Sequence, residues 1–143
     1  QTMPQMAPTA MTFSDLRNVK VLVVDDDPIT RELVETALTG LHVLSVRCCP
    51  DGFSALKLLA SFSPTVILTD IHMKPIDGFE FVRKLHSDMN PVRRQIPVIF
   101  MSADSSAETL KSALPLGASG YIVKPPSAEM LRLKITQAIL SHK

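Results

Sequence analysis

Residues 21–28 read Val-Leu-Val-Val-Asp-Asp-Asp-Pro, and this stretch predicts the fold class. Four consecutive apolar residues, three of them valine, are typical of a strand that is buried on both faces. Asp27 followed by Pro28 indicates a helix start, because aspartate caps the first turn and proline suits the first helical position. Apolar residues then recur at helical spacing as far as Gly40, which is expected to end the helix. We therefore expect a buried strand that ends in three acids and leads directly into a helix.

Polar side chains follow three further short apolar runs in the same way. They are Asp70 after residues 66–69, Ser102 after residues 98–101 and Lys124 after residues 120–123. Apolar runs separated by helical stretches indicate a parallel sheet, and sites in such sheets gather at the carboxyl ends of the strands. One edge of the sheet is therefore expected to hold three carboxylates, a hydroxyl and an ammonium, a set that suits a divalent cation and a phosphoryl group.

Five strand–helix units are expected along the chain. The strands are predicted at residues 19–24, 42–47, 65–69, 98–101 and 119–123. The helices are predicted at residues 28–40, 53–62, 79–87 and 107–114, and from Ser127 onward. Pro115 is expected to disturb the end of the fourth helix. Residues 90–97 are expected to form a connection. Right-handed crossovers place helices on both faces of a parallel sheet, so we expect a doubly wound α/β fold.

Bulk composition limits the class of protein. With 143 residues, 45% of them hydrophobic, and a net charge of +1, the chain is expected to form one globular domain. We find no basic nucleic-acid-binding face, no apolar run of the roughly 20 residues that span a membrane and no signal-peptide pattern. Cys48 and Cys49 match no disulfide framework, which favours the cytoplasm. Residues 1–18 show no periodicity and are expected to be a disordered tail, with the domain at residues 19–143.

Five motifs occur in an order that supports a more specific interpretation. They are Val-Leu-Val-Val-Asp25-Asp26-Asp27-Pro, Leu-Thr-Asp70-Ile-His-Met, Ile-Asp77-Gly78, Phe-Met-Ser102-Ala and Gly-Ala-Ser-Gly-Tyr121-Ile-Val-Lys124-Pro125. Together they resemble the receiver (response-regulator) domain of two-component signalling, of the chemotaxis-protein type, over residues 19–140. The resemblance implies a flavodoxin-like, five-stranded parallel sheet of order 2-1-3-4-5 with five helices, and a cis peptide bond before Pro125.

This strand order is expected to bring Asp25, Asp26 and Asp70 within a few ångströms of each other. Like charges at such distances are mutually unfavourable, and a hard divalent cation relieves the repulsion. The resemblance implies that the cofactor is Mg²⁺, bound directly by Asp26 and Asp70 and mainly through water by Asp25. The backbone carbonyl of His72 is expected to supply a further ligand.

The resemblance also implies what the site does. Asp70 is expected to be the phosphoacceptor, taking a phosphoryl group from a phosphohistidine of a histidine kinase or histidine phosphotransfer protein. Lys124 would neutralise the phosphoryl oxygens together with Mg²⁺. Ser102 would donate a hydrogen bond to the phosphoryl group while Tyr121 turns inward, altering the surface of the fourth helix, fifth strand and fifth helix for an output domain or a homodimer. The chain would then be no enzyme beyond its own phosphotransfer and slow autodephosphorylation.

The chain departs from the family pattern at two positions near this site. Lys74 is an extra residue in the loop after the acceptor, and Pro126 replaces a common aromatic residue. We expect the Lys74 ammonium to point to solvent, because long loop lysines stay hydrated, and the same for the lone His72 side chain. His72 and Asp104 occupy positions that vary across the family and tune dephosphorylation.

Two alternatives stay open at this point. Asp25-x-Asp27, Ser102 and Lys124 imitate the residue order of haloacid-dehalogenase phosphatases, although the late Asp-rich motif and the room for a cap domain are missing. The second alternative is a pseudo-receiver that serves only as a binding module, and the presence of all five site residues argues against it.

Overall fold

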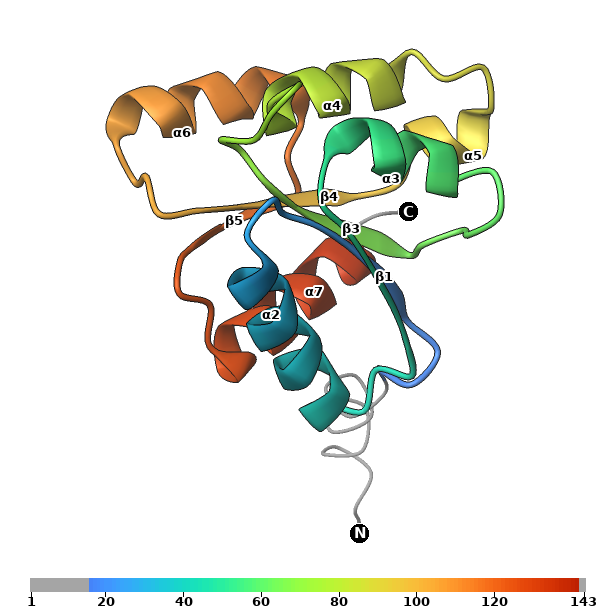
Figure 1. The fold of residues 1–143 in the computed structure, drawn as a ribbon, viewed down its shortest axis with the longest axis vertical. Helices are drawn as coiled ribbons and strands as arrows, with labels where there is room; N and C mark the ends of the chain where they lie inside the picture. Colours follow the sequence, from blue (N-terminus) through green and yellow to red (C-terminus); the bar gives the residue numbers. More distant parts are fainter. Residues whose placement is uncertain (1–15, 142–143) are drawn as a thin grey trace, which may run out of the picture.

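The computed structural model describes residues 16–141 (Figure 1). Residues 1–15, the larger part of the expected tail, lie outside the described residues. Leu16, which the sequence analysis assigned to the tail, is only 2% exposed and packs in the same core as Val19. The folded body therefore includes residues before Val19. Between residues 16 and 141, no helix combines the length and apolar character needed to cross a membrane.

A five-stranded parallel sheet forms the centre of the molecule. Its strands are β1 (Lys20–Val24), β2 (Ser45–Cys49), β3 (Val66–Asp70), β4 (Val98–Ser102) and β5 (Gly120–Val123). They pair in the order β2-β1-β3-β4-β5, and every pair is parallel. All residues of β3 and β4 are buried, as expected for central strands covered on both faces. The predicted fold class and strand order are confirmed.

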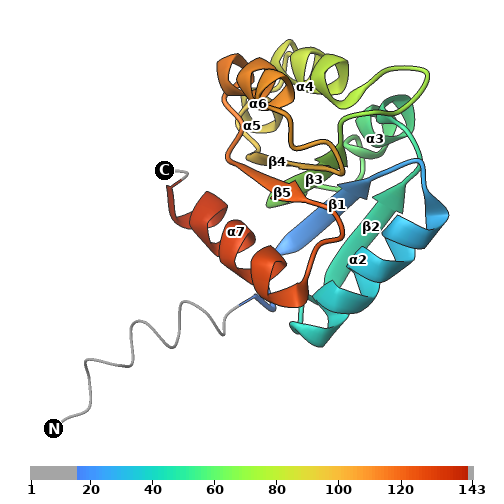
Figure 2. The same cartoon turned by 90° about the vertical axis from the view of Figure 1, so that its left-hand side faces the viewer.

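Helices cover both faces of this sheet. On one face lie α2 (Pro28–Gly40) and α7 (Ala128–Ser141), and on the other lie α3 (Gly52–Leu58), α4 (Gly78–His86) and α6 (Ala107–Ala113) (Figures 1 and 2). Side chains of each strand alternate between the two layers. In β1, Leu22 packs in the core under α3 and α4, whereas Val23 packs in the core with α2 and α7. The two cores hold the strand ends, and therefore the site, in a rigid frame.

The number of helices differs from the prediction. Five were expected, and residues 16–141 contain six α-helices and a 3₁₀ turn, η1 (Leu114–Leu116). The additional helix is α5 (Pro91–Arg94), in the expected connection, where the Asn90 side chain caps the turn by accepting a hydrogen bond from the Val92 N–H at 2.8 Å. Four residues are too few to show a hydrophobic period, so the pattern did not indicate this helix. Pro115 lies in η1, in agreement with its expected effect on the end of α6.

Strand β2 begins three residues later and ends two residues later than predicted. The preceding residues still belong to the end of α2, because the N–H groups of His42 and Val43 donate to the Thr39 and Leu38 carbonyls, both at 3.0 Å. His42 adopts a left-handed conformation with φ of 69°. Backbone groups that close the helix are not available for the sheet, so pairing starts only at Ser45.

Candidate functional site

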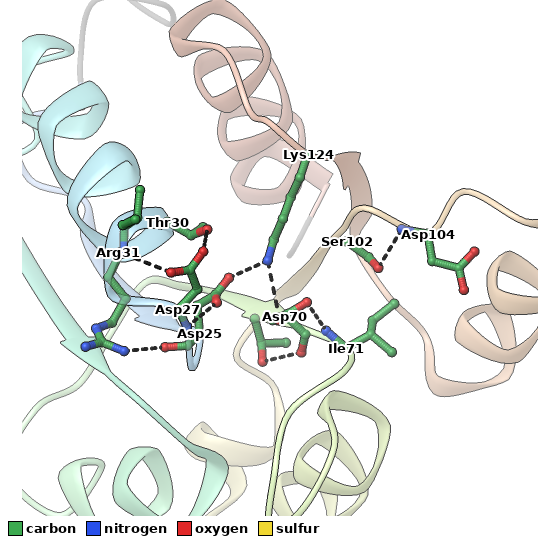
Figure 3. Close-up of polar contacts among 11 residues, drawn as sticks. Asp25, Asp27, Thr30, Arg31, Asp70, Ile71, Ser102, Asp104 and Lys124 are labelled. Carbon is green, nitrogen blue, oxygen red and sulfur yellow. Dashed lines mark hydrogen bonds and ion pairs between the residues drawn. The ribbon is translucent and has the colours of Figure 1, made fainter.

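The predicted site residues come together at the carboxyl edge of the sheet. Val24 at the end of β1 is paired with Thr69 of β3, and Asp70 is paired with Met101 of β4. The next pair, Ser102 and Val123, joins β4 to β5. The last residues of β3 and β4, and the residues directly after β1 and β5, therefore lie at one edge of the sheet, as Figure 3 shows for Asp25, Asp70, Ser102 and Lys124.

Three carboxylates form an acid triad at this edge, which we define as Asp25, Asp26 and Asp70. Each contributes an oxygen that lies within 4.8 Å of the oxygens of the other two. Asp25 is completely buried, Asp70 is 6% exposed, and Asp26 is exposed to solvent. The predicted proximity of the three acids is confirmed, with Asp26 on the solvent side.

Lys124 is the cation of the site. Its Nζ lies 2.6 Å from Asp25 Oδ2 and 3.4 Å from Asp70 Oδ2, with 16% of the side chain exposed. Burial works to lower the pKa of Lys124, but the hydrogen bond that Lys124 donates to Asp25 and the negative charges of Asp70 and Asp25 outweigh burial and raise it. The side chain is thus a fixed ammonium between two carboxylates. The Lys124–Pro125 peptide bond is cis, as the resemblance implied, and the Lys74–Pro75 bond is cis as well.

Asp70 lies in an environment that disfavours its charged form. Burial raises its pKa, and the charge of Asp25 raises it further, against the opposing effect of Lys124 and of the Ile71 N–H. That N–H donates to Asp70 Oδ1 at 2.8 Å, which leaves Oδ2 on the Lys124 side. One ammonium is therefore not enough to balance the carboxylates that surround it.

The donor set fits a hard divalent cation. Three carboxylates offer oxygen ligands, which Mg²⁺ prefers, and the exposed Asp26 opens the triad to solvent. Lys124 contacts two of the three acids, so the cluster carries a residual negative charge. The metal-ligand role of the His72 carbonyl stays a prediction.

Ser102 is completely buried at the end of β4. Its Oγ accepts a hydrogen bond from the Asp104 N–H at 3.0 Å. In that bond the oxygen is the acceptor, so the hydroxyl proton can be donated to another group, and the Tyr121 side chain is a hydrogen-bond neighbour of Ser102. The Ser102 hydroxyl, which can donate its proton, thus lies at the same edge of the sheet as the acid triad, as Figure 3 illustrates.

Asp104 connects the loops around the site, a role that the sequence analysis missed. Its carboxylate accepts hydrogen bonds from the Ser106 N–H at 2.9 Å and the Thr109 hydroxyl at 2.7 Å, and it lies 3.4 Å from His72 Nε2. The bond from the Ser106 backbone, followed by that from Thr109, lowers the pKa of Asp104 to about 2. Its backbone carbonyl accepts a hydrogen bond from the Tyr121 hydroxyl. The pattern Asp-x-Ser, typical of an Asx turn, was the available sequence signal.

The positions that depart from the family pattern lie at the surface. Lys74 is exposed, in agreement with the prediction. The His72 side chain is 63% exposed, and it also faces Asp104, a partner that was not expected. Pro126 lines a shallow depression together with Ile29 and Leu33 of α2.

Comparison with protein families defines the class of this fold and site. The family model described as "Response regulator receiver domain" matches residues 21–136. The chain therefore belongs to the response regulator receiver domain family, and its class of function is two-component signalling.

Named relatives cover this domain to different extents. The regulatory protein AtoC of Escherichia coli is 33% identical over 84% of this chain, which spans only 25% of AtoC. The chemotaxis protein CheY-3 of Vibrio cholerae is 29% identical over 83% of this chain and 90% of CheY-3. The chain thus spans 90% of a short relative and only 25% of a longer one.

Solved structures share the same fold. The chemotaxis response regulator CheY4 of Vibrio cholerae superposes with a TM-score of 0.73 and 30% identity, covering 85% of this chain and 98% of CheY4. A signal receiver domain of a histidine kinase from Syntrophus aciditrophicus gives a TM-score of 0.75 and 26% identity, over 87% of this chain and 92% of that domain.

The raised pKa of Asp70 leads to a prediction for the metal-free protein. The pKa of Asp70 in the folded protein lies above the ordinary 3.8. The protonated carboxyl therefore contributes to the stability of the fold below pH 3.8, and this contribution is lost as the pH rises through the folded pKa. At pH 7 with a chelator, the neutral variant Asp70→Asn is expected to melt a few degrees above the wild type by circular dichroism. The exposed control Glu32→Gln is expected to match the wild type. A lower melting temperature for Asp70→Asn would contradict the assigned repulsion.

Proposed function

We propose that this chain is a phospho-accepting receiver, with Asp70 as the residue that becomes phosphorylated. The observation that carries the proposal is the position of Asp70 Oδ2, 3.4 Å from the Lys124 ammonium and within the acid triad. Phosphoryl transfer depends on positioning and charge neutralisation, and these groups supply both.

Mg²⁺ is the cofactor in this proposal. Asp26 and Asp70 would hold the ion directly, and Asp25 would act mainly through water. The chemistry that Mg²⁺ supplies when bound is neutralisation of negative charge on phosphoryl oxygens. Lys124 adds a fixed positive charge on the side of the triad that faces β5.

The transfer step takes place between Asp70 and a phosphohistidine of a histidine kinase or histidine phosphotransfer protein. A carboxylate oxygen of Asp70 attacks phosphorus and forms an O–P bond, while the N–P bond to the histidine breaks. The imidazole leaves with the electron pair of that bond and takes up a proton. The products are an aspartyl phosphate on this chain and a neutral histidine on the partner.

The surface beside the acid triad offers a place for this partner. Ile29 and Leu33 of α2 are 68% and 55% exposed, and they line a depression with Pro126. Because α2 starts just after Asp27 and Pro126 lies two residues beyond Lys124, this apolar surface adjoins the site. Apolar side chains in contact with water favour docking of a partner.

The switch of the proposed receiver consists of Ser102 and Tyr121. A hydrogen bond from a hydroxyl to a charged group contributes roughly 1.5–3 kcal/mol, enough to shift a two-state equilibrium by about tenfold to a hundredfold. The Ser102 proton would make this bond to the phosphoryl group, and the loop that ends at Asp104 would move with it. The Tyr121 hydroxyl, bound to the Asp104 carbonyl, would transmit the change.

The output surface in this proposal is formed by α6, β5 and α7. Apolar side chains are exposed on each of these elements, among them Leu110, Val123 and Met130. An output domain or a second copy of the chain would bind there. We place the domain in the cytoplasm, since both of its cysteines are free.

The phosphatase alternative requires Asp25 as the nucleophile, and its geometry disfavours this. Asp25 is completely buried, its Oδ1 accepts from the Asp27 N–H at 2.9 Å and its Oδ2 pairs with Lys124. We therefore propose that the chain is no enzyme beyond its own phosphotransfer and autodephosphorylation. Repeated turnover of p-nitrophenyl phosphate that is lost in Asp25→Asn and kept in Asp70→Asn would favour the phosphatase.

Incubation with acetyl phosphate and Mg²⁺ tests the proposed function. We expect intact-protein mass spectrometry to show a gain of one phosphoryl group in the wild type and none in Asp70→Asn. Asp88→Asn, a change in a distant loop, is the matched control and is expected to be labelled like the wild type. A wild type without mass gain would support the pseudo-receiver instead, and a gain kept in Asp70→Asn would move the acceptor to another residue.

A further inference from the structure

Arg31 makes a contact with the site that the proposed function does not use. It lies in the first turn of α2, where its N–H donates to the Asp27 carbonyl at 3.0 Å. Its guanidinium Nη1 donates to the backbone carbonyl of Asp25 at 2.7 Å, as drawn in Figure 3. A cationic side chain therefore holds the main chain next to the acid triad.

The contact completes a full set of partners around Asp25. The N–H donates to the Cys49 carbonyl at 3.0 Å, and Oδ1 accepts from the Asp27 N–H at 2.9 Å. Oδ2 pairs with Lys124 at 2.6 Å, and the carbonyl accepts from Arg31. This carbonyl belongs to the peptide group that joins Asp25 to Asp26, so the contact with Arg31 acts on that peptide group.

The orientation of that peptide determines the direction in which Asp26 leaves the chain. Asp25 is held by the sheet and by its buried side chain, whereas Asp26 is exposed. A hydrogen bond to the carbonyl restricts rotation of the peptide plane between the two residues. The Asp26 carboxylate is thereby kept close to Asp70.

We propose that Arg31 is a positioning residue of the acid triad: by holding the peptide between Asp25 and Asp26, it raises the affinity of the triad for Mg²⁺. This inference rests on the magnesium site of the proposed function. Partners that orient metal ligands change metal affinity by about 10–100-fold when they are removed.

The positive charge of Arg31 is expected to lower the affinity for Mg²⁺, whereas its positioning contact is expected to raise it. The direction of the change in affinity therefore distinguishes the two effects. A guanidinium on the Asp25 carbonyl is a positive charge beside the proposed cation site and repels a divalent cation, so its removal by electrostatics alone would tighten Mg²⁺ binding. Removal of a positioning contact would weaken it. The two explanations therefore predict changes of opposite direction in the same variant.

The experiment measures the Mg²⁺ dissociation constant of Arg31→Met from the dependence of melting temperature on Mg²⁺ concentration. We expect affinity about tenfold weaker than in the wild type. Glutamine is neutral, favourable in a helix and too short to replace the contact. Arg31→Gln is therefore expected to weaken Mg²⁺ binding as well. The matched control Arg47→Met removes a cation from β2 that stacks on Phe62, and it is expected to bind Mg²⁺ at least as tightly as the wild type.

The outcomes separate this inference from the proposed function. Equal or tighter binding in Arg31→Met or Arg31→Gln, with a wild type that responds to Mg²⁺, overturns the role of Arg31 alone. A wild type whose melting temperature does not change with millimolar Mg²⁺ overturns the magnesium site, and this inference with it.

Discussion

Replacement of Lys124 by methionine is expected to destabilise the metal-free protein by about 3 kcal/mol and to prevent phosphoryl labelling of Asp70. Lys124 faces two buried carboxylates, at 2.6 Å from Asp25 and 3.4 Å from Asp70. Methionine fills a similar volume but leaves the Asp25 carboxylate buried without its counter-charge. Removal of one partner of a buried pair is costly for this reason.

The pH dependence of this effect follows from the raised pKa of Lys124. Its folded pKa lies above the ordinary 10.5, so its contribution to stability is complete below pH 10.5 and is lost as the pH rises through the folded pKa. The difference between wild type and Lys124→Met is thus expected to be large at pH 7 and to shrink at strongly alkaline pH. Urea unfolding at several pH values measures it.

A second substitution separates the buried charge from simple packing. In Lys124→Met/Asp25→Asn the counter-charge and the carboxylate are both absent, and most of the lost stability is expected to return. Lys111→Met, on the exposed side of α6, is the matched control and is expected to stay within about 0.5 kcal/mol of the wild type. A Lys124→Met variant as stable as this control would show that the ion pair is not a significant part of the fold.

Gly78→Ala is expected to destabilise the protein by about 1–3 kcal/mol, although the change adds a single methyl group. A Cβ on Gly78 would lie 2.2 Å from the backbone carbonyl oxygen of Asp70 and 3.0 Å from the Ile71 Cα. The Gly78 N–H also donates to the Ile71 carbonyl at 2.7 Å, which holds the start of α4 against the end of β3. Backbone atoms surround the added methyl group, so it has no flexible side chain to displace.

Gly40→Ala is the matched control for this prediction. No atom lies within 4 Å of the position that its Cβ would take, and Gly40 is part of α2. Alanine is favoured over glycine in a helix, so Gly40→Ala is expected to leave stability unchanged or to raise it by up to about 1 kcal/mol. Urea unfolding compares the two variants. If Gly78→Ala were as stable as Gly40→Ala, the close approach of α4 to Asp70 would be wrong.

The fold could be predicted from the sequence because its signals are local and periodic. The apolar runs before Asp25, Asp70, Ser102 and Lys124 each indicated a buried strand, and the structure has a strand at all four. The first three runs are buried, whereas β5 lies at the edge of the sheet with only Ile122 buried. The predicted helices and strands were wrong where a segment was too short to show a hydrophobic period, or where residues expected in one element belong to the end of another. The one-turn α5 has no period, and His42 and Val43 complete the end of α2 instead of beginning β2.

The site could be predicted as a set of residues and only in part as a geometry. Topology brings strand ends to one edge, which is why the acids, the hydroxyl and the lysine meet there. The Asx turn at Asp104 has a sequence signal, but the contacts of Asp104 with His72 and Tyr121 and the contact of Arg31 could not be predicted, because each depends on loop conformations and side-chain rotamers. A contact such as Arg31 Nη1 to the Asp25 carbonyl leaves no pattern in the order of residues.

Hydrophobic periodicity along this chain was enough to determine a doubly wound sheet and the edge at which its polar residues collect, since burial of apolar surface is the dominant driving force and depends mainly on spacing. Tertiary packing alone decided which of the three acids is exposed, which of them pairs with Lys124 and which backbone groups hold them in place. Those features depend on distances of a few ångströms in a medium of low polarity, where the same charges interact far more strongly than in water.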